Sequence, residues 1–319
     1  MSQATRAIPN PAFTAEPASA RAYVETTKPG ITRLVTITAC VGLVMGALAS
    51  GDVSPARLAY LVIIVAVGTA LASGGANALN MWLEAARDAR MRRTSGRPLP
   101  SHRLAPGGVA RFGVVTTLLG VLVLALGAGP APAIVALACA GVYVFVYTPL
   151  KTRTAWNTVV GTIPGALPPI IGTSAVAATS GPGALAEPLG WSLFALMTVW
   201  QLPHFYAIAW MYRDDYERGG FRMLSLGDDR AARTSLAMVA LAALLIPATL
   251  SPALAAPHLL GLPYIALASL TGVAFLAACV RFRMDRTRSR ARAVFLASIA
   301  HLPLLMLAMV IEALTRSVV

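Results

Sequence analysis

The sequence predicts an all-α polytopic membrane protein with nine transmembrane helices, arranged as two pseudo-repeated four-helix halves followed by a ninth helix. Of the 319 residues, 57% are hydrophobic and 12% are charged, and the mean hydropathy is +0.69. Backbone polar groups in lipid must be satisfied within their own segment, so apolar stretches of bilayer length are predicted to be helices. The nine stretches span residues 34–50, 58–79, 112–128, 131–150, 159–178, 191–211, 235–255, 259–280 and 293–314.

The placement of positive charge predicts the orientation of these spans. Of 26 Lys and Arg residues, 24 fall in the N-terminal tail or in the loops after the second, fourth, sixth and eighth spans, and only Arg57 and Arg316 do not. This positive-inside bias predicts a multi-pass protein of the cell (inner) membrane, with a cytoplasmic N-terminus and the C-terminus on the opposite side. A net charge of +13 distributed in this way does not indicate nucleic-acid binding.

The N-terminal region, residues 1–30, is predicted to be a flexible cytoplasmic tail, and residues 31–319 a single transmembrane domain. The tail lacks an apolar core, so we expect no secretory signal. The three cysteines, Cys40, Cys139 and Cys279, each fall inside a predicted span. Their odd number and wide separation favour a packing role over disulfides or metal binding.

The most informative stretch follows the second span and reads NALNMWLEAARDARMRRTSGRPLP. Asn80, Glu84 and Asp88 are four residues apart, so on a helix they share one face. Three oxygen ligands in a row suit a hard cation such as Mg²⁺. Arginines crowd around them, and this combination predicts a site for a metal-bound diphosphate. The alternative is a solvated face whose carboxylates pair with neighbouring arginines.

Other basic residues are candidates for binding the same diphosphate. Arg97, Lys151 and Arg153 lie in loops that are expected to converge near the Asn80–Asp88 row. Arginine grips phosphate oxygens bidentately, and lysine supplies a point charge. For each of them, a role in topology signalling alone is the alternative.

The fifth span contains the sequence GTIPGALPPIIG, with Pro164, Pro168 and Pro169 within six residues. Proline removes a backbone donor, and small residues permit close approach. We therefore predict a kinked helix that lines a cavity.

A second acidic cluster, Asp214, Asp215 and Glu217, follows the sixth span. Adjacent residues on a helix point about 100° apart, so only one of Asp214 and Asp215 can face the site squarely. Asp215 is predicted to be the second-site metal ligand, with Asp214 near the diphosphate. Asp228 and Asp229 are predicted to be loop residues or an N-cap for the next helix.

The sixth span itself carries the aromatic sequence WQLPHFYAIAW. His204, Trp200 and Tyr206 are candidates for a wall that contacts a flat aromatic substrate. A satisfied core histidine is the alternative for His204. His301 lies near the middle of the ninth span, and an axial ligand role for it has no specific support.

Seven of the 13 acidic residues lie in the loops after the second and sixth spans, and none lies near the middle of a span. Proton pumps and ion-coupled carriers usually keep ionisable groups at the bilayer midplane. The pattern therefore favours an enzyme working at the cytoplasmic mouth of the bundle over a carrier or channel.

Three long stretches carry a resemblance to a known family: NMWLEAARDARMRRTSGRPLP, YTPLKTRTAWNTVVGTIPGALPPIIG and WQLPHFYAIAWMYRDDYERGGFRML. They resemble the haem O synthases, or protohaem IX farnesyltransferases, of the UbiA superfamily of intramembrane prenyltransferases. The resemblance covers the chain from about Lys28 to the end of the ninth span. It implies nine helices around a central cavity that opens sideways to lipid.

The resemblance also implies an activity and its partners. The substrates would be farnesyl diphosphate and haem b, and the cofactor would be Mg²⁺. The product would be haem o, which forms by prenylation of a vinyl group with addition of water. Haem o would then be used in terminal oxidase assembly. A downstream haem-modifying enzyme or oxidase assembly factor is a possible partner. The first metal motif of the family falls on Asn80, Glu84 and Asp88, which with Asp215 form the predicted catalytic and metal-binding set.

The sequence departs from the family pattern at two positions. Similar members carry a further acid two residues after the central acid of the first motif, which is Glu84 here, and this chain has Ala86 at that position. The second motif of the superfamily is usually Asp-x-x-x-Asp, and this chain has Gly219 in place of its second acid. Second-site metal binding is therefore less firmly implied than the first. An enzyme of the same superfamily that prenylates a quinone or chlorophyll precursor remains an alternative, since the metal motif does not distinguish acceptors.

Overall fold

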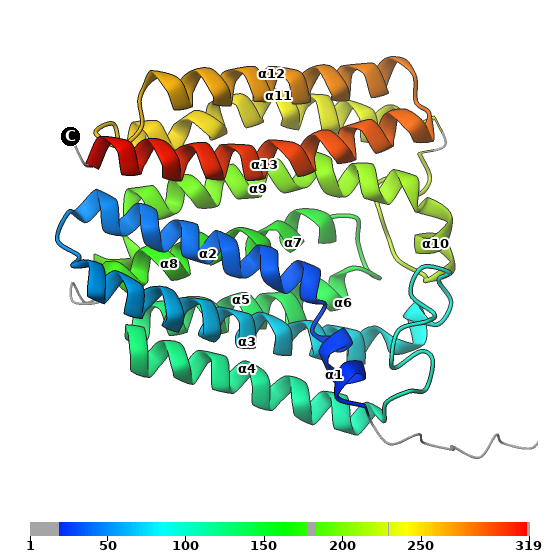
Figure 1. Cartoon of the computed structure of the whole chain (residues 1–319). Coiled ribbons are helices and arrows are strands. Elements are labelled where there is room, and N and C mark those ends of the chain that lie inside the picture. The colour runs from blue at the N-terminus through cyan, green and yellow to red at the C-terminus, as the bar shows by residue number, and fades with distance from the viewer. Residues whose placement is uncertain (1–18, 178–182, 229, 318–319) are drawn as a thin grey trace, which may run out of the picture.

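The computed structural model describes residues 19–177, 183–228 and 230–317, and within these ranges it contains helices and no strand (Figure 1). The helices are α1 (Ala20–Thr26), α2 (Pro29–Ser50), α3 (Pro55–Asp88), α4 (Pro106–Ala128), α5 (Pro130–Gly141), the π-helical segment η1 (Val142–Tyr147), α6 (Thr148–Leu150), α7 (Asn157–Ala166), α8 (Pro168–Val176), α9 (Pro188–Met211), α10 (Arg213–Arg218), α11 (Ala232–Ala255), α12 (Leu262–Met284) and α13 (Arg288–Ser317). The predicted all-α membrane architecture is confirmed.

Eight helical segments of the described residues are long and apolar enough to cross a membrane. The remaining predicted span corresponds to α9, which has 24 residues but carries Gln201, Pro203 and His204 and three tryptophans. These residues lower its hydropathy, and α9 lies inside the bundle against α7, α11 and α13. The count of nine spans, and the pairing into two four-helix halves, therefore remain predictions.

Part of the predicted tail is folded. Residues 20–26 form α1, which contacts α3, and α2 begins at Pro29. The predicted boundary at residue 30 thus falls within the helical bundle, while residues 1–18 lie outside the described residues.

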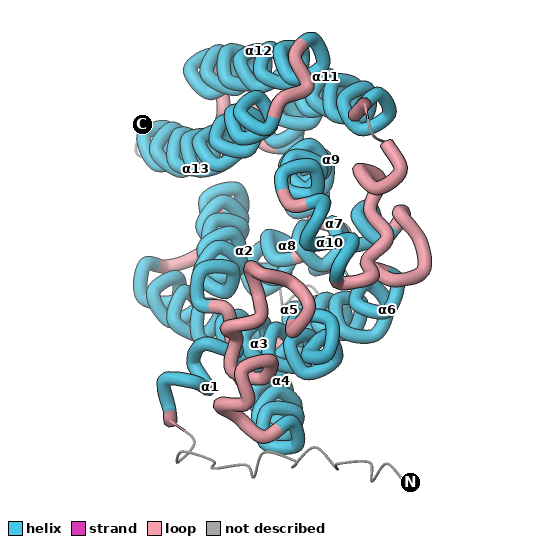
Figure 2. The backbone as a smooth tube through the Cα atoms, turned by 90° about the vertical axis from the view of Figure 1, so that its right-hand side faces the viewer, coloured by secondary structure: helices cyan, strands magenta, loops and turns pink. Residues whose placement is uncertain are grey.

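The apolar core has two main parts. One lies among α9, α11, α12 and α13, and the other lies among α2, α3, α4, α5 and α8. Figure 2, turned by 90° from Figure 1, shows α11–α13 on one side of α9 and the helices of the first half of the chain on the other. The three cysteines are free, as predicted.

Small residues set the distance between α3 and α4. A Cβ atom on Gly75 of α3 would lie 2.6 Å from the Gly113 carbonyl oxygen of α4, and one on Gly120 of α4 would lie 2.5 Å from the Gly68 carbonyl oxygen of α3. Without an apolar driving force in lipid, such close backbone approach supplies much of the helix–helix attraction. The long helix α3 is therefore held along its length by α4.

The fifth predicted span is broken, as the prolines predict. It consists of α7 and α8, separated at Leu167, with Pro164 inside α7 and Pro168 at the start of α8. The preceding span passes from α5 through the π-helical segment η1 into α6. Both irregular segments lie in the half of the bundle that contains the cavity described below.

The basic loops lie at one end of the bundle. The loops that follow α3, α6, α10 and α12 lie at the same end as α1, whereas the C-terminal end of α13 lies at the other (Figure 1). The charge asymmetry seen along the sequence is therefore an asymmetry between the two ends of the folded protein.

Asp228 lies in the loop before α11, whose N-cap residue is Ala231, and its side chain binds amides in the first turn of that helix. Its carboxylate accepts hydrogen bonds from the Thr234 amide (2.7 Å), the Thr234 hydroxyl (2.7 Å) and the Arg233 amide (3.3 Å). Burial alone would raise the pKa of Asp228, but these hydrogen bonds hold its pKa below the ordinary value of 3.8. Asp229 lies outside the described residues.

We expect Asp228→Ala to destabilise the protein by about 1 kcal/mol near neutral pH, the usual effect of removing a helix cap. Because the pKa is lower in the folded protein, the stabilisation is present above the unfolded pKa and is lost as the pH falls through the folded value. Thermal unfolding in detergent at pH 7 and pH 3 measures this, with exposed Asp285→Ala as the control. An equal loss of stability at both pH values would contradict a role for the ionised carboxylate.

Candidate active site

A cavity of about 450 Å³ lies between α2, α3, α5, η1, α7, α8 and α9. On α3 its lining extends from Asp88 back to Thr69, which is roughly 28 Å at 1.5 Å per residue. Charged side chains gather at one end, whereas Ala72, Ile171 and Met197 are among the residues that line the remainder. The cavity thus has a polar mouth and a long apolar interior, and the kinked α7–α8 pair lines it as predicted.

The polar end is built on a row of side chains from α3. Asn77, Asn80, Glu84 and Asp88 all lie on this one helix and are between 0% and 4% exposed. The spacing of the last three therefore produces one buried face, not a solvated one. Glu84, Asp88 and Asn77 line the cavity, whereas Asn80 does not.

Each of the three predicted ligands is paired with a cation from a different segment. Lys151 Nζ lies 2.8 Å from Glu84 Oε1 and donates to Oε2 at 3.1 Å. Arg97 donates to Asp88 Oδ2 at 2.7 Å. Lys28 donates to Asn80 Oδ1 at 2.5 Å. The convergence expected for Arg97 and Lys151 is thus present, and Lys28 joins them.

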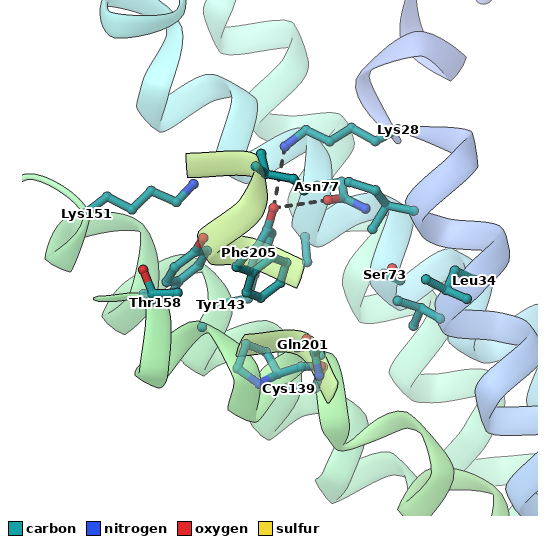
Figure 3. A pocket seen from close by; sticks show the side chains of 18 of the residues that line it. Lys28, Leu34, Ser73, Asn77, Cys139, Tyr143, Lys151, Thr158, Gln201 and Phe205 are labelled. Atoms are coloured by element: carbon teal, nitrogen blue, oxygen red, sulfur yellow. Dashed lines mark hydrogen bonds between the residues drawn. The ribbon is translucent and has the colours of Figure 1, made fainter. Parts of the chain in front are cut away.

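Lys28 was not identified from the sequence. It precedes the Pro29–Gly30 start of α2 in a left-handed conformation (φ 50°), which allows the chain to turn from α1 into α2. Its ammonium group lines the cavity, and Figure 3 shows it extending toward the same space as Lys151. Burial, followed by the positive charges of Arg97 and Lys151, lowers the pKa of Lys28 to about 7. An anion bound between these three cations would restore its charged form.

The position of Lys151 is fixed by its backbone as well as its ion pair. Its carbonyl oxygen accepts a hydrogen bond from the Arg222 amide at 2.7 Å, which joins the loop after α6 to the loop after α10. Burial alone would lower the pKa of Lys151, but the charge of Glu84 raises it above its usual range. Lys151 therefore stays protonated at neutral pH.

Two tyrosines of the π-helical segment complete the polar end, and neither was identified from the sequence. Tyr143 donates to Asn77 Oδ1 at 3.2 Å and accepts from Lys28 at 3.4 Å, as the dashed lines in Figure 3 show. The Lys151 ammonium lies 4.6 Å from the ring centre of Tyr147. The two rings stack with their centres 5.8 Å apart. π-Helical turns of this kind are frequent at functional sites.

The aromatic wall predicted on α9 is present in part. Trp200, His204 and Phe205 line the cavity. The His204 ring stacks with those of Trp200 and Phe295, whose ring centres lie 5.2 Å and 5.1 Å away. Tyr206 is buried in the core shared with α11–α13 and does not line the cavity. His301 packs on Phe275 of α12, also outside the cavity.

Comparison with known proteins decides the family. The profile of the UbiA prenyltransferase family matches residues 35–301. The chain belongs to the UbiA prenyltransferase family. Proteins named protoheme IX farnesyltransferase are similar over most of their length: that of Solibacter usitatus is 40% identical over 295 residues, covering 89% of this chain and 96% of the relative. The relative from Opitutus terrae is 39% identical, and the match covers 92% of this chain and 94% of the relative.

Solved structures share the UbiA fold. A digeranylgeranylglyceryl phosphate synthase matches with a TM-score of 0.72 at 14% identity, covering 92% of this chain and 98% of that one. A UbiA homologue of Archaeoglobus fulgidus bound to GPP and Mg²⁺ matches with a TM-score of 0.60 at 12% identity. The match covers 93% of this chain and 100% of that one. The identities are low, so these likenesses concern the fold.

The second acidic cluster of this UbiA protein is arranged differently from the first. Asp215 is buried, accepts a hydrogen bond from the Arg92 amide at 3.2 Å and pairs with Arg218. Burial alone would raise the pKa of Asp215, but these contacts lower it. Asp214 is exposed and lies 3.6 Å from Arg213. Of the two adjacent acids, the buried one is thus the residue predicted, although neither lines the cavity.

Asp215 holds the loop after α3 against α10. Arg93 from the same loop lies over the Tyr212 ring, 5.0 Å from its centre. Arg153, one of the three basic residues predicted to bind the diphosphate, is exposed and does not line the cavity. The predicted set therefore divides into residues at the cavity and residues that support or flank it.

The side chains at the polar end carry donor atoms of the kind that a hard divalent cation binds. Asn80, Glu84 and Asp88 offer amide and carboxylate oxygens, which Mg²⁺ prefers. Glu84 Oε1 is buried and accepts no hydrogen bond, although it lies 2.8 Å from the Lys151 ammonium. The described residues contain no cluster of three or more His, Cys, Asp and Glu side chains that could hold a metal ion, so Glu84 and Asp88 would need oxygen ligands of another kind beside them.

Proposed function

We propose that this protein transfers the farnesyl group of farnesyl diphosphate to a vinyl group of haem b, with addition of water, and so produces haem o. The observation that carries the proposal is the polar end of the cavity, where a buried row of oxygens on α3 faces Lys28, Arg97 and Lys151. The acceptor is supported by relatives at about 40% identity, named protoheme IX farnesyltransferase, that align over most of the chain.

The diphosphate is proposed to lie between the three cations, where its negative charge replaces some of their contacts with Asn80, Glu84 and Asp88. These three side chains would hold Mg²⁺, which supplies charge neutralisation at the phosphate oxygens. Lys28, Arg97 and Lys151 then stabilise the charge that develops on the departing diphosphate as the allylic C–O bond breaks. The proposal also includes Asp215 as an additional metal ligand and Asp214 and Arg153 at the diphosphate, which requires these side chains to move toward the cavity on substrate binding.

The apolar part of the cavity is suited to the farnesyl tail and its reactive cation. Beyond Asn77, the lining along α3 consists of small residues over about two turns, namely Thr69, Ala72, Ser73 and Ala76. This wall excludes water until the new C–C bond has formed between farnesyl C1 and the terminal vinyl carbon. The remaining cation, next to the porphyrin ring, is then captured by water, which releases a proton and leaves a hydroxyl group.

We propose the α9 side of the cavity for the porphyrin. Trp200, His204 and Phe205 present aromatic surface there. Offset stacking of a flat ring system on such side chains is favourable, and the polar tips of Trp and His provide orientation. Haem and prenyl tail would thus approach the reaction centre from different walls of one cavity.

Pigment analysis tests the function. Membranes of cells that express the chain are expected to contain haem b increased in mass by one farnesyl group plus water, detected by liquid chromatography and mass spectrometry. Asp88→Ala is expected to remove this product, whereas Asp285→Ala, which changes an exposed carboxylate at the same end, is expected to retain it. Unchanged haem b in the presence of well-expressed protein, together with prenylation of hydroxybenzoate by the purified enzyme, would reverse the choice of acceptor.

We further infer that the polar end of the cavity faces the cytoplasm of a bacterial inner membrane. The inference rests on the basic loops, which lie at the same end of the bundle as Glu84, Asp88 and Lys151 (Figure 1). An alkaline phosphatase reporter fused to the C-terminus is expected to be active, because that end would lie outside the cytoplasm. An inactive phosphatase with an active cytoplasmic reporter at the same position would invert the assignment.

A further inference from the structure

His204 is joined to α13 by a single short hydrogen bond. Its Nδ1 atom lies 2.7 Å from the Ser298 hydroxyl oxygen. The same serine anchors the neighbouring ring of the wall, since Trp200 Nε1 donates to the Ser298 carbonyl oxygen at 2.9 Å. Ser298 is 0% exposed, so this contact is removed from competing water. One residue of α13 therefore fixes two aromatic rings of α9.

The direction of the bond to His204 follows from the other partner of Ser298. A serine hydroxyl has one hydrogen to donate, and Ser298 donates it to the Phe295 carbonyl oxygen at 2.6 Å. Toward His204 the hydroxyl oxygen can only accept. The proton of the His204 ring therefore lies on Nδ1, and in the neutral ring Nε2 carries a lone pair.

Nothing in the described part of the chain uses that lone pair. The hydrogen bonds of the described residues include none to His204 Nε2, and His204 lines the cavity. The neighbouring polar residue of this wall is different, because the Gln201 amide nitrogen donates to the Met197 carbonyl oxygen at 2.9 Å. His204 thus offers the cavity an acceptor that is not engaged by the protein.

The ring is also held against rotation. Two aromatic rings stack with it, that of Trp200 at an interplanar angle of 19° and that of Phe295 at an angle of 26°. Trp200, His204 and Ile208 are four residues apart on α9 and all line the cavity, which places them on one helix face. A histidine with one nitrogen bound to an oxygen and the ring packed against neighbours has the usual surroundings of a metal-binding histidine.

We propose that Ser298 is a positioning residue that holds His204 as the Nδ1–H tautomer, so that Nε2 binds the iron of an iron porphyrin in the cavity. The inference rests on the proposed function, because haem b is the acceptor assigned there. Iron ligation would fix the height and rotation of the porphyrin against α9. The vinyl group would then meet the farnesyl chain in one orientation.

The test measures haem binding by the purified full-length protein in detergent without farnesyl diphosphate. Haem b is titrated, and its Soret absorption and the iron–histidine stretch in resonance Raman spectra of the ferrous form are recorded. The wild-type protein is expected to show a histidine-ligated iron. His204→Gly is expected to lose that signature and to regain it when imidazole is added. A histidine-ligated spectrum in His204→Gly without imidazole, or its absence from the wild type, would overturn the proposal.

Ser298 is tested by matched serine variants. Ser298→Ala is expected to weaken haem binding by roughly 10–100-fold and to shift the iron–histidine stretch, as loss of an outer partner of a metal ligand does. Ser298→Thr keeps the hydroxyl and is expected to retain both properties. Ser251→Ala removes a hydroxyl that donates to the Ala248 carbonyl oxygen on α11 at 2.8 Å and serves as the structural control. Equal affinity and stretch frequency in wild type and Ser298→Ala would refute the role of Ser298.

The result is separable from the proposed function. Histidine-ligated haem in a protein that forms no haem o would leave this inference intact and remove the proposed reaction. Haem o formation at the wild-type rate by His204→Gly would support the proposed reaction and contradict iron ligation by His204.

Discussion

Glu84→Gln is expected to lower the rate of prenyl transfer by roughly 10²–10³-fold, the usual effect of removing one group that stabilises charge in a buried site. The substitution keeps the shape of the side chain and removes its charge. Glu84 is 4% exposed and paired with Lys151 at 2.8 Å. Glutamine offers a single neutral oxygen to a divalent cation and leaves the lysine without its counter-charge. Steady-state assays with farnesyl diphosphate and haem b, at increasing Mg²⁺, measure the effect.

The loss of the ion pair can also reduce stability, and this must be separated from the loss of function. Breaking a buried pair by removing one partner typically costs about 3–5 kcal/mol, whereas removing both partners is far less harmful. The double variant Glu84→Gln/Lys151→Met is therefore expected to recover thermal stability without recovering activity. Recovery of both in the double variant would show that the pair is structural and would contradict its role in binding the diphosphate.

The Asn80–Asp88 row could be recognised from the sequence because its geometry is local. A spacing of four places side chains on one face of any helix, and α3 continues without interruption to Asp88. The broken fifth span was predictable for the same reason, since proline acts on the backbone of its own segment. That the face of Glu84 is buried and not solvated depends on packing, which the spacing alone does not contain.

Lys28 and Tyr143 could not be identified in this way because their positions depend on contacts between distant segments. Lys28 meets Asn80 across 52 residues of sequence, and Tyr143 meets Asn77 across 66. In the sequence, Lys28 is one of many basic residues near a span, and Tyr143 is an ordinary aromatic residue of an apolar stretch. The one local signal for Lys28 is the Pro-Gly pair that follows it at the start of the first span.

The predicted aromatic wall shows the limit of reading one helix alone. Trp200 and His204 are four residues apart and share a face, whereas Tyr206 is two residues further and points into the core with α11–α13. The helical period separates these two faces. Which face meets the cavity is decided by the neighbouring helices, since α11 and α13 pack against α9.

Gly172→Ala is expected to destabilise the protein severely, although replacing glycine by alanine within a helix ordinarily stabilises it by about 0.5–1 kcal/mol. Gly172 of α8 faces α2, and an added Cβ would lie 2.9 Å from the Gly42 carbonyl carbon and closer still to the Ala39 carbonyl oxygen and the Leu43 amide nitrogen. These are backbone atoms, so no side chain can turn away to make room. Overpacking of this kind typically costs about 1–3 kcal/mol and occasionally more.

The two helices have little freedom to separate. The contact is reciprocal, since a Cβ on Gly42 of α2 would meet the carbonyl group of Pro169 of α8. On its other sides α2 packs against α3 and α13, so a shift of α2 disturbs both. Ile171, the neighbour of Gly172, lines the cavity, and activity is therefore expected to fall together with stability.

Gly141→Ala provides the matched control. Gly141 ends α5 with helical dihedral angles, and an added Cβ would have no atom within 4 Å. Thermal unfolding in detergent and the monodisperse yield after extraction are expected to be unchanged or improved in Gly141→Ala and reduced in Gly172→Ala. Equal melting temperatures for the two variants would mean that α2 and α8 can separate at no cost, and the close approach of their backbones would not be what holds this side of the cavity together.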